Sequence, residues 1–195
     1  VVGENAAIIA TGMKSKVYVV DKSKDRLKQL HELFGDKIIA AESDKIDLKK
    51  LVSECDLLIG GVLIPGAEAP KLVSKEMIKS MKRGSVVVDV AIDQGGCIET
   101  SKPTTHADPT YTVDDVVHYC VANMPGGVPR TSTMALNKAT LPLLIKIADQ
   151  GYKKTLLSDK NFLAGLNIFK GKITCKGVAE AFKIKYFPPE DVITA

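Results

Sequence analysis

The sequence is poor in cysteine, and its four cysteines lie far apart. Cys55, Cys97, Cys120 and Cys175 form no CxxC pair, the spacing that zinc sites and dithiol redox sites commonly use. We therefore expect no zinc site and no redox-active disulfide, and no spacing of His, Asp and Glu suggests another metal site. The simplest expectation is that all four are reduced and that each is a buried, inert thiol.

Long apolar runs and targeting signals are missing as well. No apolar run approaches the length that spans a bilayer. No charged start, apolar middle and small-residue cleavage site marks a signal peptide. These absences argue against a membrane partner and favour a cytoplasmic protein. The sequence also begins at Val1 without an initiator methionine, so we expect a domain, a proteolytic product or a partial chain.

Two further function classes have little support. The formal charge of +4 is mild for 195 residues, and no run of basic residues is interleaved with aromatics. We therefore expect no nucleic-acid partner. Neither a GxSxG turn nor a Ser-His-Asp order indicates a hydrolase. The 45% hydrophobic and 26% charged content is typical of a globular protein, and the length suffices for one full domain and part of another.

Hydrophobic patterning predicts strands that alternate with helices. Apolar, β-branched runs predict buried strands over 16–20, 37–41, 56–59, 85–90 and 116–121. Helices are predicted over 4–13, 23–34, 47–54 and 74–81, with Ser23 and Ser74 as amino-terminal caps and Gly35 as a stop. This alternation predicts an α/β fold with a parallel sheet and right-handed crossovers.

The pattern changes near Pro129. The polar stretch 94–112 predicts a long functional loop, and proline and glycine break the chain over 65–70. Beyond Pro129 a long helix is predicted over about 131–148, capped by Thr131 or Ser132. The remainder is predicted to be helical and turn-like, without strand alternation. We therefore predict two parts, 1–129 and 130–195.

Two residues fit the second half of a dinucleotide-binding turn. Gly3 directly precedes the helix predicted from Glu4, and Asp21 ends the strand that follows. In such folds a final glycine lets the pyrophosphate reach a helix amino terminus, and an acid binds the ribose hydroxyls. Locally, Gly3 is equally an ordinary helix start and Asp21 an ordinary cap. If Asp21 is the ribose acid, it favours NAD over NADP, because a 2′-phosphate would meet like charge.

Two longer segments are more specific. They are Val-Asp-Val-Ala-Ile-Asp-Gln-Gly-Gly-Cys-Ile-Glu-Thr over 88–100, with Pro-Thr-Thr-His at 103–106, and His-Tyr-Cys-Val-Ala-Asn-Met-Pro-Gly-Gly-Val-Pro-Arg-Thr-Ser-Thr over 118–133. Both closely resemble signatures of the alanine dehydrogenase family, and the resemblance covers essentially the whole chain. It implies an incomplete Rossmann-like, doubly wound parallel sheet over 1–129, without its first strand and first glycines, followed by a helical segment over 130–195.

A related family is the runner-up. The dinucleotide-binding subunit of proton-translocating transhydrogenase tends to carry an acidic Glu-Gln-Gly-Gly variant and lacks the Met-Pro-Gly-Gly-Val-Pro-Arg-Thr-Ser-Thr form. A third alternative is a non-catalytic nucleotide-binding module. The alanine dehydrogenase resemblance implies reversible conversion of L-alanine, NAD and water to pyruvate, ammonium and NADH.

Asp93 is the catalytic residue that the resemblance implies. It follows the buried strand over 85–90, and open α/β sheets place ligands at such carboxyl ends. It matches the family's catalytic aspartate near the nicotinamide, where it would orient the ribose, stabilise a cationic intermediate or assist proton transfer. The alternative is a loop acid that caps the turn of Gln94, Gly95 and Gly96.

The same resemblance assigns a set of NAD contacts. The pyrophosphate turn matches Val1, Val2 and Gly3, and the ribose acid matches Asp21, with Arg26 as a nearby polar contact. Ser43 matches an adenine-side contact, and Val62 and Leu63 match the strand end beside the adenosine. The residues that match the nicotinamide lining are Val90, Ala91, Ile92, Asp93, Val121, Ala122, Asn123 and Met124. Lys102 stands where family members often carry Arg, and it lacks the bidentate fork. Core packing is the alternative for the apolar members, and an exposed helix cation for Arg26. His31, His106 and His118 are expected to be structural or surface residues.

The resemblance also implies a missing amino-terminal domain. That domain would supply the catalytic histidine and the cations that hold the substrate carboxylate, so the 195-residue chain alone should be inactive. Without it the long helix should expose an apolar face that includes Leu136, Leu141, Leu144 and Ile145. Family members assemble as hexamers, so a homo-oligomer is expected.

Overall fold

The computed structural model describes residues 1–64, 66 and 68–194, and these form two compact units. The first comprises Val1–Leu63 and Ala69–Ala122, and the second comprises Ile64–Glu68 and Asn123–Ala195. The boundary predicted near Pro129 falls inside the second unit. In the break predicted over 65–70, residues 65 and 67 lie outside the described part of the chain.

The first unit alternates strands with helices. Its elements are α1 (Val2–Gly12), β1 (Val17–Asp21), α2 (Lys24–Phe34), the 3-10 turn η1 (Gly35–Lys37), β2 (Ile38–Glu42), α3 (Leu48–Glu54), β3 (Leu57–Gly60), α4 (Lys75–Lys79), β4 (Val86–Asp89), the 3-10 turn η2 (Val90–Gln94), β5 (Thr110–Val113) and β6 (Val116–Tyr119). The elements of the second unit are η3 (Met124–Gly127), α5 (Pro129–Gln150), α6 (Tyr152–Ser158), α7 (Lys160–Ala164), β7 (Ile168–Phe169), β8 (Lys172–Ile173), α8 (Lys176–Ala181) and α9 (Pro189–Thr194).

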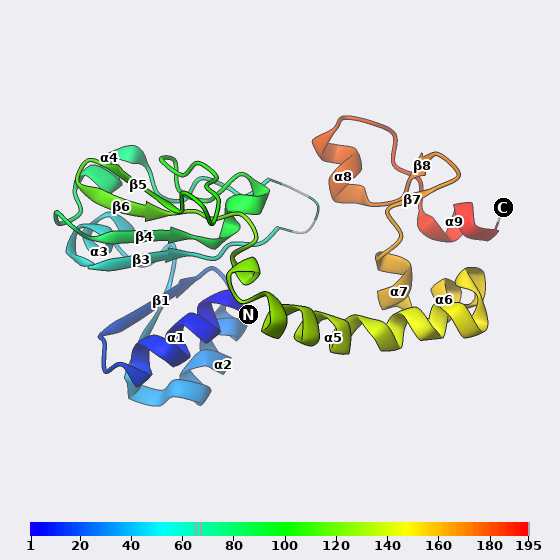
Figure 1. Cartoon of the computed structure of the whole chain (residues 1–195), viewed down its shortest axis with the longest axis horizontal. Helices are drawn as coiled ribbons and strands as arrows, with labels where there is room; N and C mark the ends of the chain where they lie inside the picture. Colours follow the sequence, from blue (N-terminus) through cyan, green and yellow to red (C-terminus); the bar gives the residue numbers. More distant parts are fainter. Residues whose placement is uncertain (65, 67, 195) are drawn as a thin grey trace. The chain divides into compact units, whose positions relative to one another are not determined.

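The strands of the first unit form two sheets. β1 pairs with β2 in parallel, and a second sheet has the order β3-β4-β6-β5, with β4 between β3 and β6 (Figure 1). β3, β4 and β6 run parallel to one another, so the predicted α/β fold with a parallel sheet is confirmed. Among the described residues, β1 and β3 are sheet edges that do not pair with each other. Their side chains Tyr18 and Leu57 are 38% and 51% exposed.

Each sheet has its own apolar core. α1 and α2 cover β1 and β2 through Ala7, Leu30, Phe34 and Ile38. α3 and α4 cover the larger sheet, where the core is built from Val52, Ala69, Val73, Ile78, Met81, Val87, Ala91, Cys97, Ile98 and Val116. The larger core therefore holds the strand β4 and the beginning and end of the loop that follows it. This packing fixes the chain segment in which the candidate catalytic residue lies.

Three α-helices of the first unit begin at side-chain caps. Ser23, Asp47 and Ser74 each accept a hydrogen bond from the backbone N–H three residues later, at 3.2, 3.0 and 3.3 Å. These bonds satisfy amide donors that the helix itself leaves unpaired. The predicted caps Ser23 and Ser74 are confirmed, and Gly35 ends α2 with a positive φ of 56°.

Some short strands differ from expectation. The predicted loop over 94–112 ends in β5, which pairs antiparallel with β6, so the sheet has an antiparallel edge. The region after Pro129 consists mainly of helices, and it also contains a small antiparallel hairpin of β7 and β8 that was not predicted. These strands have only four and two residues, and their pairing rather than their hydrophobic period defines them.

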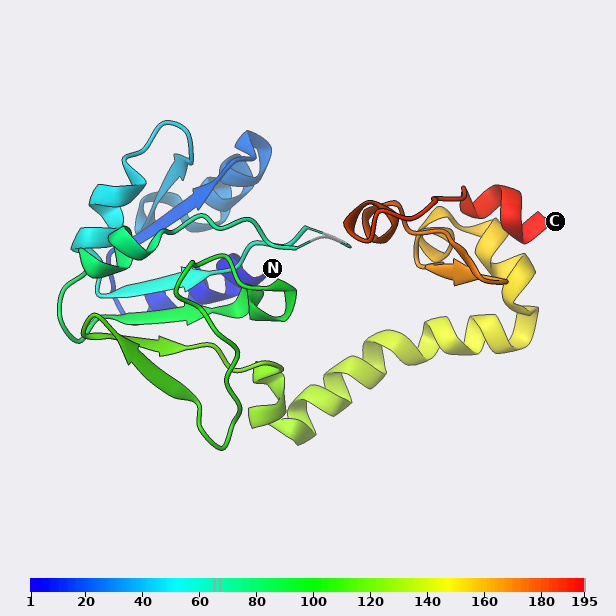
Figure 2. The same ribbon diagram turned by 90° about the horizontal axis from the view of Figure 1, so that it is seen from above.

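The long helix α5 is continuous from Pro129 to Gln150 (Figure 2). It begins earlier than predicted, with proline in its first turn and without a side-chain cap, because a proline needs no amide partner there. Ser132 does not cap it: its hydroxyl donates to the Pro125 carbonyl oxygen at 2.7 Å. No α5 residue is buried, and the predicted apolar face is exposed at Leu136, Leu141, Leu144 and Ile145.

His118 is a core residue of the larger sheet. Its ring is fully buried, its Nδ1–H donates to the Val116 carbonyl oxygen at 3.0 Å, and its Nε2 lies 2.7 Å from the Thr100 hydroxyl. Burial lowers the pKa of His118 below the usual 6.5. Below about pH 6.5 the unfolded chain therefore takes up a proton that the folded chain resists.

We expect this histidine to make the fold less stable in mild acid. The free energy of unfolding, measured by urea at pH 7.5 and pH 5.5, should fall with pH in the wild type and fall less in His118→Gln. His31→Gln, which changes an exposed histidine, is the matched control and should keep the wild-type slope. An identical pH dependence in His118→Gln and the wild type would rule out this role.

Further expectations concern the cysteines, membrane spans and metal ions. Cys55, Cys97, Cys120 and Cys175 are all free thiols, of which Cys97 and Cys120 are buried and the other two are half-buried. Within the described residues no helix is both long and apolar enough to cross a membrane, and no group of His, Cys, Asp and Glu is arranged to hold a metal ion.

Candidate functional site

One cavity of the first unit lies where three predicted stretches meet. It has a volume of about 230 Å³, and it is lined from the start of α1, from the chain after β3 and from η2 after β4 by Val2, Gly61, Val62, Leu63, Val90, Ala91, Asp93 and Gln94. Six of these residues were predicted as coenzyme contacts. Because β3 and β4 are parallel, their carboxyl ends meet at the same edge of the sheet, where open α/β folds bind ligands.

Gly61, which lines this cavity, lies close to the start of α1. A side chain at Gly61 would place its Cβ 3.0 Å from Cγ1 of Val2 and 3.8 Å from the backbone nitrogen of Gly3. A Cβ there would press on the Val2 side chain, so glycine leaves room for the start of α1. Gly3 itself is in the first turn of α1, and a Cβ there would meet nothing within 4 Å. Of these two glycines, Gly61 is therefore the one whose lack of a side chain leaves room for α1.

Asp93 and Gln94 form the polar part of the lining. Asp93 is exposed in the first turn of η2, and Gln94 is half-buried beside it. The Oε1 atom of Gln94 is buried and accepts no hydrogen bond within the described protein. An unsatisfied buried acceptor is unfavourable, so this oxygen suits a ligand that donates a hydrogen bond. Gln94 was not among the candidate contacts predicted from the sequence. Its signal was a polar residue directly after the candidate aspartate at a strand end.

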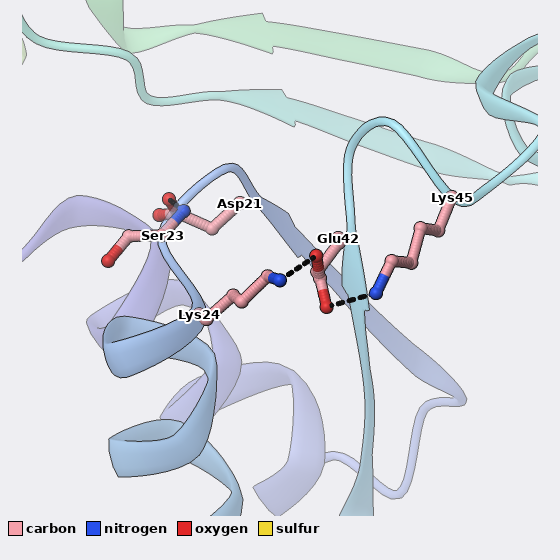
Figure 3. A network of polar contacts seen from close by, with 5 residues as sticks. All are labelled: Asp21, Ser23, Lys24, Glu42 and Lys45. Carbon is pink, nitrogen blue, oxygen red and sulfur yellow. Dashed lines mark hydrogen bonds and ion pairs between the residues drawn. The ribbon is translucent and has the colours of Figure 1, made fainter.

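The predicted ribose acid lies at the end of β1. Asp21 accepts a hydrogen bond from the Ser23 backbone nitrogen at 2.8 Å through Oδ1, which fixes its carboxylate at the start of α2 (Figure 3). The Ser43 backbone nitrogen donates to the Asp21 carbonyl oxygen at 3.1 Å. Ser43, the predicted adenine-side contact, therefore lies next to the acid at the end of the neighbouring strand.

A second acid pairs in register with Asp21. Glu42 is opposite Asp21 in the β1–β2 ladder, and its carboxylate binds Lys45 Nζ at 2.9 Å and Lys24 Nζ at 3.7 Å (Figure 3). The hydrogen bond from Lys45 lowers the pKa of Glu42, and the charge of Lys24 contributes. Glu42 keeps both lysines as partners, so this corner presents an acid at the end of each strand.

Arg26 is engaged within the first unit. Its guanidinium forms an ion pair with Glu4 and donates a hydrogen bond to Gln29 Oε1 at 2.9 Å. The ion pair joins the first turn of α2 to the first turn of α1, next to the predicted pyrophosphate turn. Arg26 thus lies near the predicted ribose site, with its charge directed to Glu4.

Lys102 lines a different cavity. That cavity has a volume of about 310 Å³ and is formed by Lys102, Pro103, Thr104, Thr105, Asp108, Thr110 and Tyr111. The Lys102 ammonium lies over the Tyr111 ring, 4.5 Å from its centre. The structure therefore does not bring Lys102 together with Asp93, and a coenzyme contact of Lys102 stays a prediction.

The other predicted contacts lie in several places. Val1 is exposed at the start of the chain. Ile92 and Val121 are buried, so their side chains pack in the protein interior, and Ala122 is exposed at the end of the first unit. Asn123 and Met124 belong to the second unit. The cavity thus unites the phosphate-turn, strand-end and loop residues, and leaves the 121–124 contacts as predictions.

A family model and a curated relative both show that this chain is similar to alanine dehydrogenases. Residues 1–176 match the family described as alanine dehydrogenase/PNT, C-terminal domain. The chain is 55% identical to the alanine dehydrogenase of Halomonas elongata over 193 residues. The matched region covers 99% of this chain and 52% of that protein. The chain therefore spans about half the length of the curated relatives it matches.

Two solved structures are similar to the fold. An L-alanine dehydrogenase superposes with a TM-score of 0.79 and 46% identity, over 91% of this chain and 49% of the other. A transhydrogenase from Sinorhizobium meliloti superposes with a TM-score of 0.66 and 26% identity, over 76% of this chain and 42% of the other. Both identity and TM-score are higher for the alanine dehydrogenase.

Proposed function

The chain belongs to the alanine dehydrogenase/PNT C-terminal-domain family, and from this premise we propose that it is the NAD-binding part of an alanine dehydrogenase. The whole enzyme would convert L-alanine, NAD and water reversibly to pyruvate, ammonium and NADH. The observation that carries the proposal is the cavity at the carboxyl ends of β3 and β4, which is lined by Asp93 and Gln94.

The cavity residues fit a nicotinamide dinucleotide. The close approach at Gly61 keeps the start of α1 beside the strand ends, where the amide groups of the helix favour a pyrophosphate. The free acceptor Gln94 Oε1 suits a donor such as a carboxamide or ribose hydroxyl. Asp21 at the end of β1 would accept from the adenosine ribose. When bound, NAD supplies the nicotinamide ring that accepts a hydride from the alanine Cα.

Asp93 would act on the substrate side of the cavity. Its exposed carboxylate can stabilise positive charge that develops on the alanine nitrogen as the Cα is oxidised, and it can hold a proton near that centre. Gln94 and the apolar residues Val90 and Ala91 would orient the ring and exclude water on the other side.

The remaining machinery is proposed to lie in a further domain. The chain spans 52% of the Halomonas elongata relative, which leaves room for the histidine and the carboxylate-binding cations that the reaction needs. A strand from a preceding segment would pair between the free edges of β1 and β3, and the exposed apolar face of α5 would pack on the same domain. The chain alone would then be inactive. A cytoplasmic location and a homohexamer stay predictions.

Transhydrogenase is the second candidate, because the Sinorhizobium meliloti structure shares the fold. The Asp93-Gln94-Gly95-Gly96 sequence favours the first candidate, since the resemblance gives the transhydrogenase subunit glutamate at that position. A non-catalytic nucleotide-binding module is the third. The lower identity to the transhydrogenase, 26% against 46%, also favours alanine dehydrogenase.

Reduction of NAD by the full-length protein separates these functions. We expect NADH to form when L-alanine is added, and to be consumed when pyruvate and ammonium are added. Transfer between NADH and an NADP analogue without any response to alanine would favour a transhydrogenase. Binding of NADH with neither reaction would favour a non-catalytic module.

Coenzyme choice should depend on Asp21. Asp21→Asn removes the charge that would repel a 2′-phosphate while it keeps one acceptor for the ribose. The ratio of kcat/KM for NAD to that for NADP should therefore fall about tenfold or more, which corresponds to about 1.4 kcal/mol. Asp36→Asn, an exposed acid in η1, is the control and should keep the wild-type ratio. An unchanged ratio in Asp21→Asn would remove Asp21 from the ribose site.

A further inference from the structure

Asp89, the last residue of β4, has a fully buried carboxylate. Its exposed fraction is 0%, and it accepts three backbone hydrogen bonds: from Ala91 at 3.1 Å through Oδ1, and from Cys97 at 2.9 Å and Ile98 at 3.1 Å through Oδ2. The donors come from both ends of the segment 90–98. One side chain therefore closes this segment into a loop at the end of the strand.

Neighbouring residues are shaped around this carboxylate. The Cys97 thiol lies 3.5 Å from Oδ1, and burial, followed by the charge of Asp89, raises the pKa of Cys97 to about 12. The thiol therefore stays protonated and can donate a fourth hydrogen bond. Gly96 has a φ of +76°, and a Cβ there would lie 2.8 Å from Asp89 Oδ2. The segment thus approaches the carboxylate more closely than a side chain would permit.

The same segment carries the polar lining of the candidate site. Asp93 and Gln94 lie within 90–98 and line the cavity, whereas Asp89 does not line it. We propose that Asp89 is a positioning residue, whose carboxylate holds the segment 90–98 so that Asp93 and Gln94 face the nicotinamide end of the coenzyme. This inference rests on the proposed NAD-binding function.

The charge of Asp89 is essential to this role. An ionised carboxylate only accepts hydrogen bonds, and bonds to an ionised acceptor are stronger than bonds between neutral groups. Asparagine has nearly the same shape, but its amide group would direct N–H donors toward the N–H groups of the loop. Asp89→Asn should therefore release one end of the segment with little change in side-chain volume.

The expected effect is confined to one half of the coenzyme. Release of 90–98 disturbs the nicotinamide side, while Asp21 and the start of α1 belong to other elements and would still bind the adenosine side. A general loss of folding would weaken both halves together. Comparing NADH with ADP, which lacks the nicotinamide, therefore separates positioning from a merely structural role.

The test is a pair of titrations on the full-length protein. For Asp89→Asn we expect the Kd for NADH to rise at least tenfold and the Kd for ADP to change less than twofold. Asp114→Asn, an exposed acid in the β5–β6 turn, is the matched control and should bind both ligands like the wild type. If Asp89→Asn does not fold, Cys97→Ala removes the thiol donor and leaves the three backbone donors in place, and it should weaken NADH binding about threefold with ADP binding unchanged.

The outcomes separate this inference from the function beneath it. Suppose that the wild type binds NADH and that Asp89→Asn binds it equally well. The positioning role of Asp89 is then overturned, while the proposed NAD-binding function stands. Equal NADH binding by Cys97→Ala has the same meaning if Asp89→Asn does not fold. Equal weakening of NADH and ADP would also overturn the positioning role, since that pattern indicates general disruption. A wild type that binds neither NADH nor ADP would contradict the proposed function and this inference together.

Discussion

Replacement of Asp93 by asparagine is expected to lower kcat for alanine-dependent NAD reduction by about 10²–10⁴-fold in the full-length protein. The exposed carboxylate lies in the first turn of η2 at the rim of the cavity, where its charge would stabilise a cationic centre on the substrate. Asparagine keeps the shape and the hydrogen-bonding oxygen but removes the charge and the ability to hold a proton. The Kd for NADH should change less than about threefold, because the other lining residues remain.

Steady-state rates and NADH titrations on the same preparations check this prediction. Asp114→Asn serves as the control for an acid-to-amide change elsewhere in the first unit, and it should keep the wild-type kcat. Near-normal rates in Asp93→Asn would remove the catalytic role. A large loss of NADH affinity with kcat unchanged would make Asp93 a coenzyme ligand instead.

A second large effect is expected at Gly60, where β3 ends. A Cβ on Gly60 would lie 2.4 Å from Cys97 Sγ and 3.2 Å from Asp89 Oδ1, and neither group has free space to move into. Gly60→Ala should therefore reduce the free energy of unfolding by about 1–3 kcal/mol, the usual range for an overpacked core. The same clash should push the 90–98 segment out of place and weaken NADH binding.

Chemical denaturation of four variants makes this test specific. Gly60→Ala, Cys97→Ala, the double variant and Gly12→Ala should be compared with the wild type. Removal of the Cys97 sulfur should make the double variant less destabilised than the sum of the two single changes. Gly12→Ala is the control, since a Cβ there meets nothing within 4 Å, and it should not be destabilising. Gly60→Ala with wild-type stability would contradict the close contact.

Local sequence signals predicted much of the first unit. The caps Ser23 and Ser74 and the stop at Gly35 act within one turn of their own helix, so a sequence window contains the whole interaction. β1 and β4 are apolar runs that remain strands in the structure. β5 was missed because it follows a polar loop and is paired only through β6, and β7 and β8 were missed because two-residue strands have no hydrophobic period of their own.

In the candidate site, too, the sequence predicts some features, and packing determines the others. Asp93 could be predicted from its motif and its place after a strand, and Val2, Val62, Leu63, Val90 and Ala91 join it in one cavity. The sequence does not show that Asp89, four residues earlier, is buried and saturated with donors whereas Asp93 is exposed. The unpaired Gln94 oxygen is likewise a property of packing. Burial therefore distinguishes these two acids where residue type does not.

A structure of the full-length protein with NADH tests the central claim most directly. We predict that the nicotinamide ring lies in the cavity at the carboxyl ends of β3 and β4, with the Asp93 carboxylate beside its reactive face and Gln94 Oε1 in hydrogen-bonding distance of the coenzyme. A nicotinamide bound away from this cavity, with Asp93 and Gln94 not contacting the coenzyme, would contradict the account.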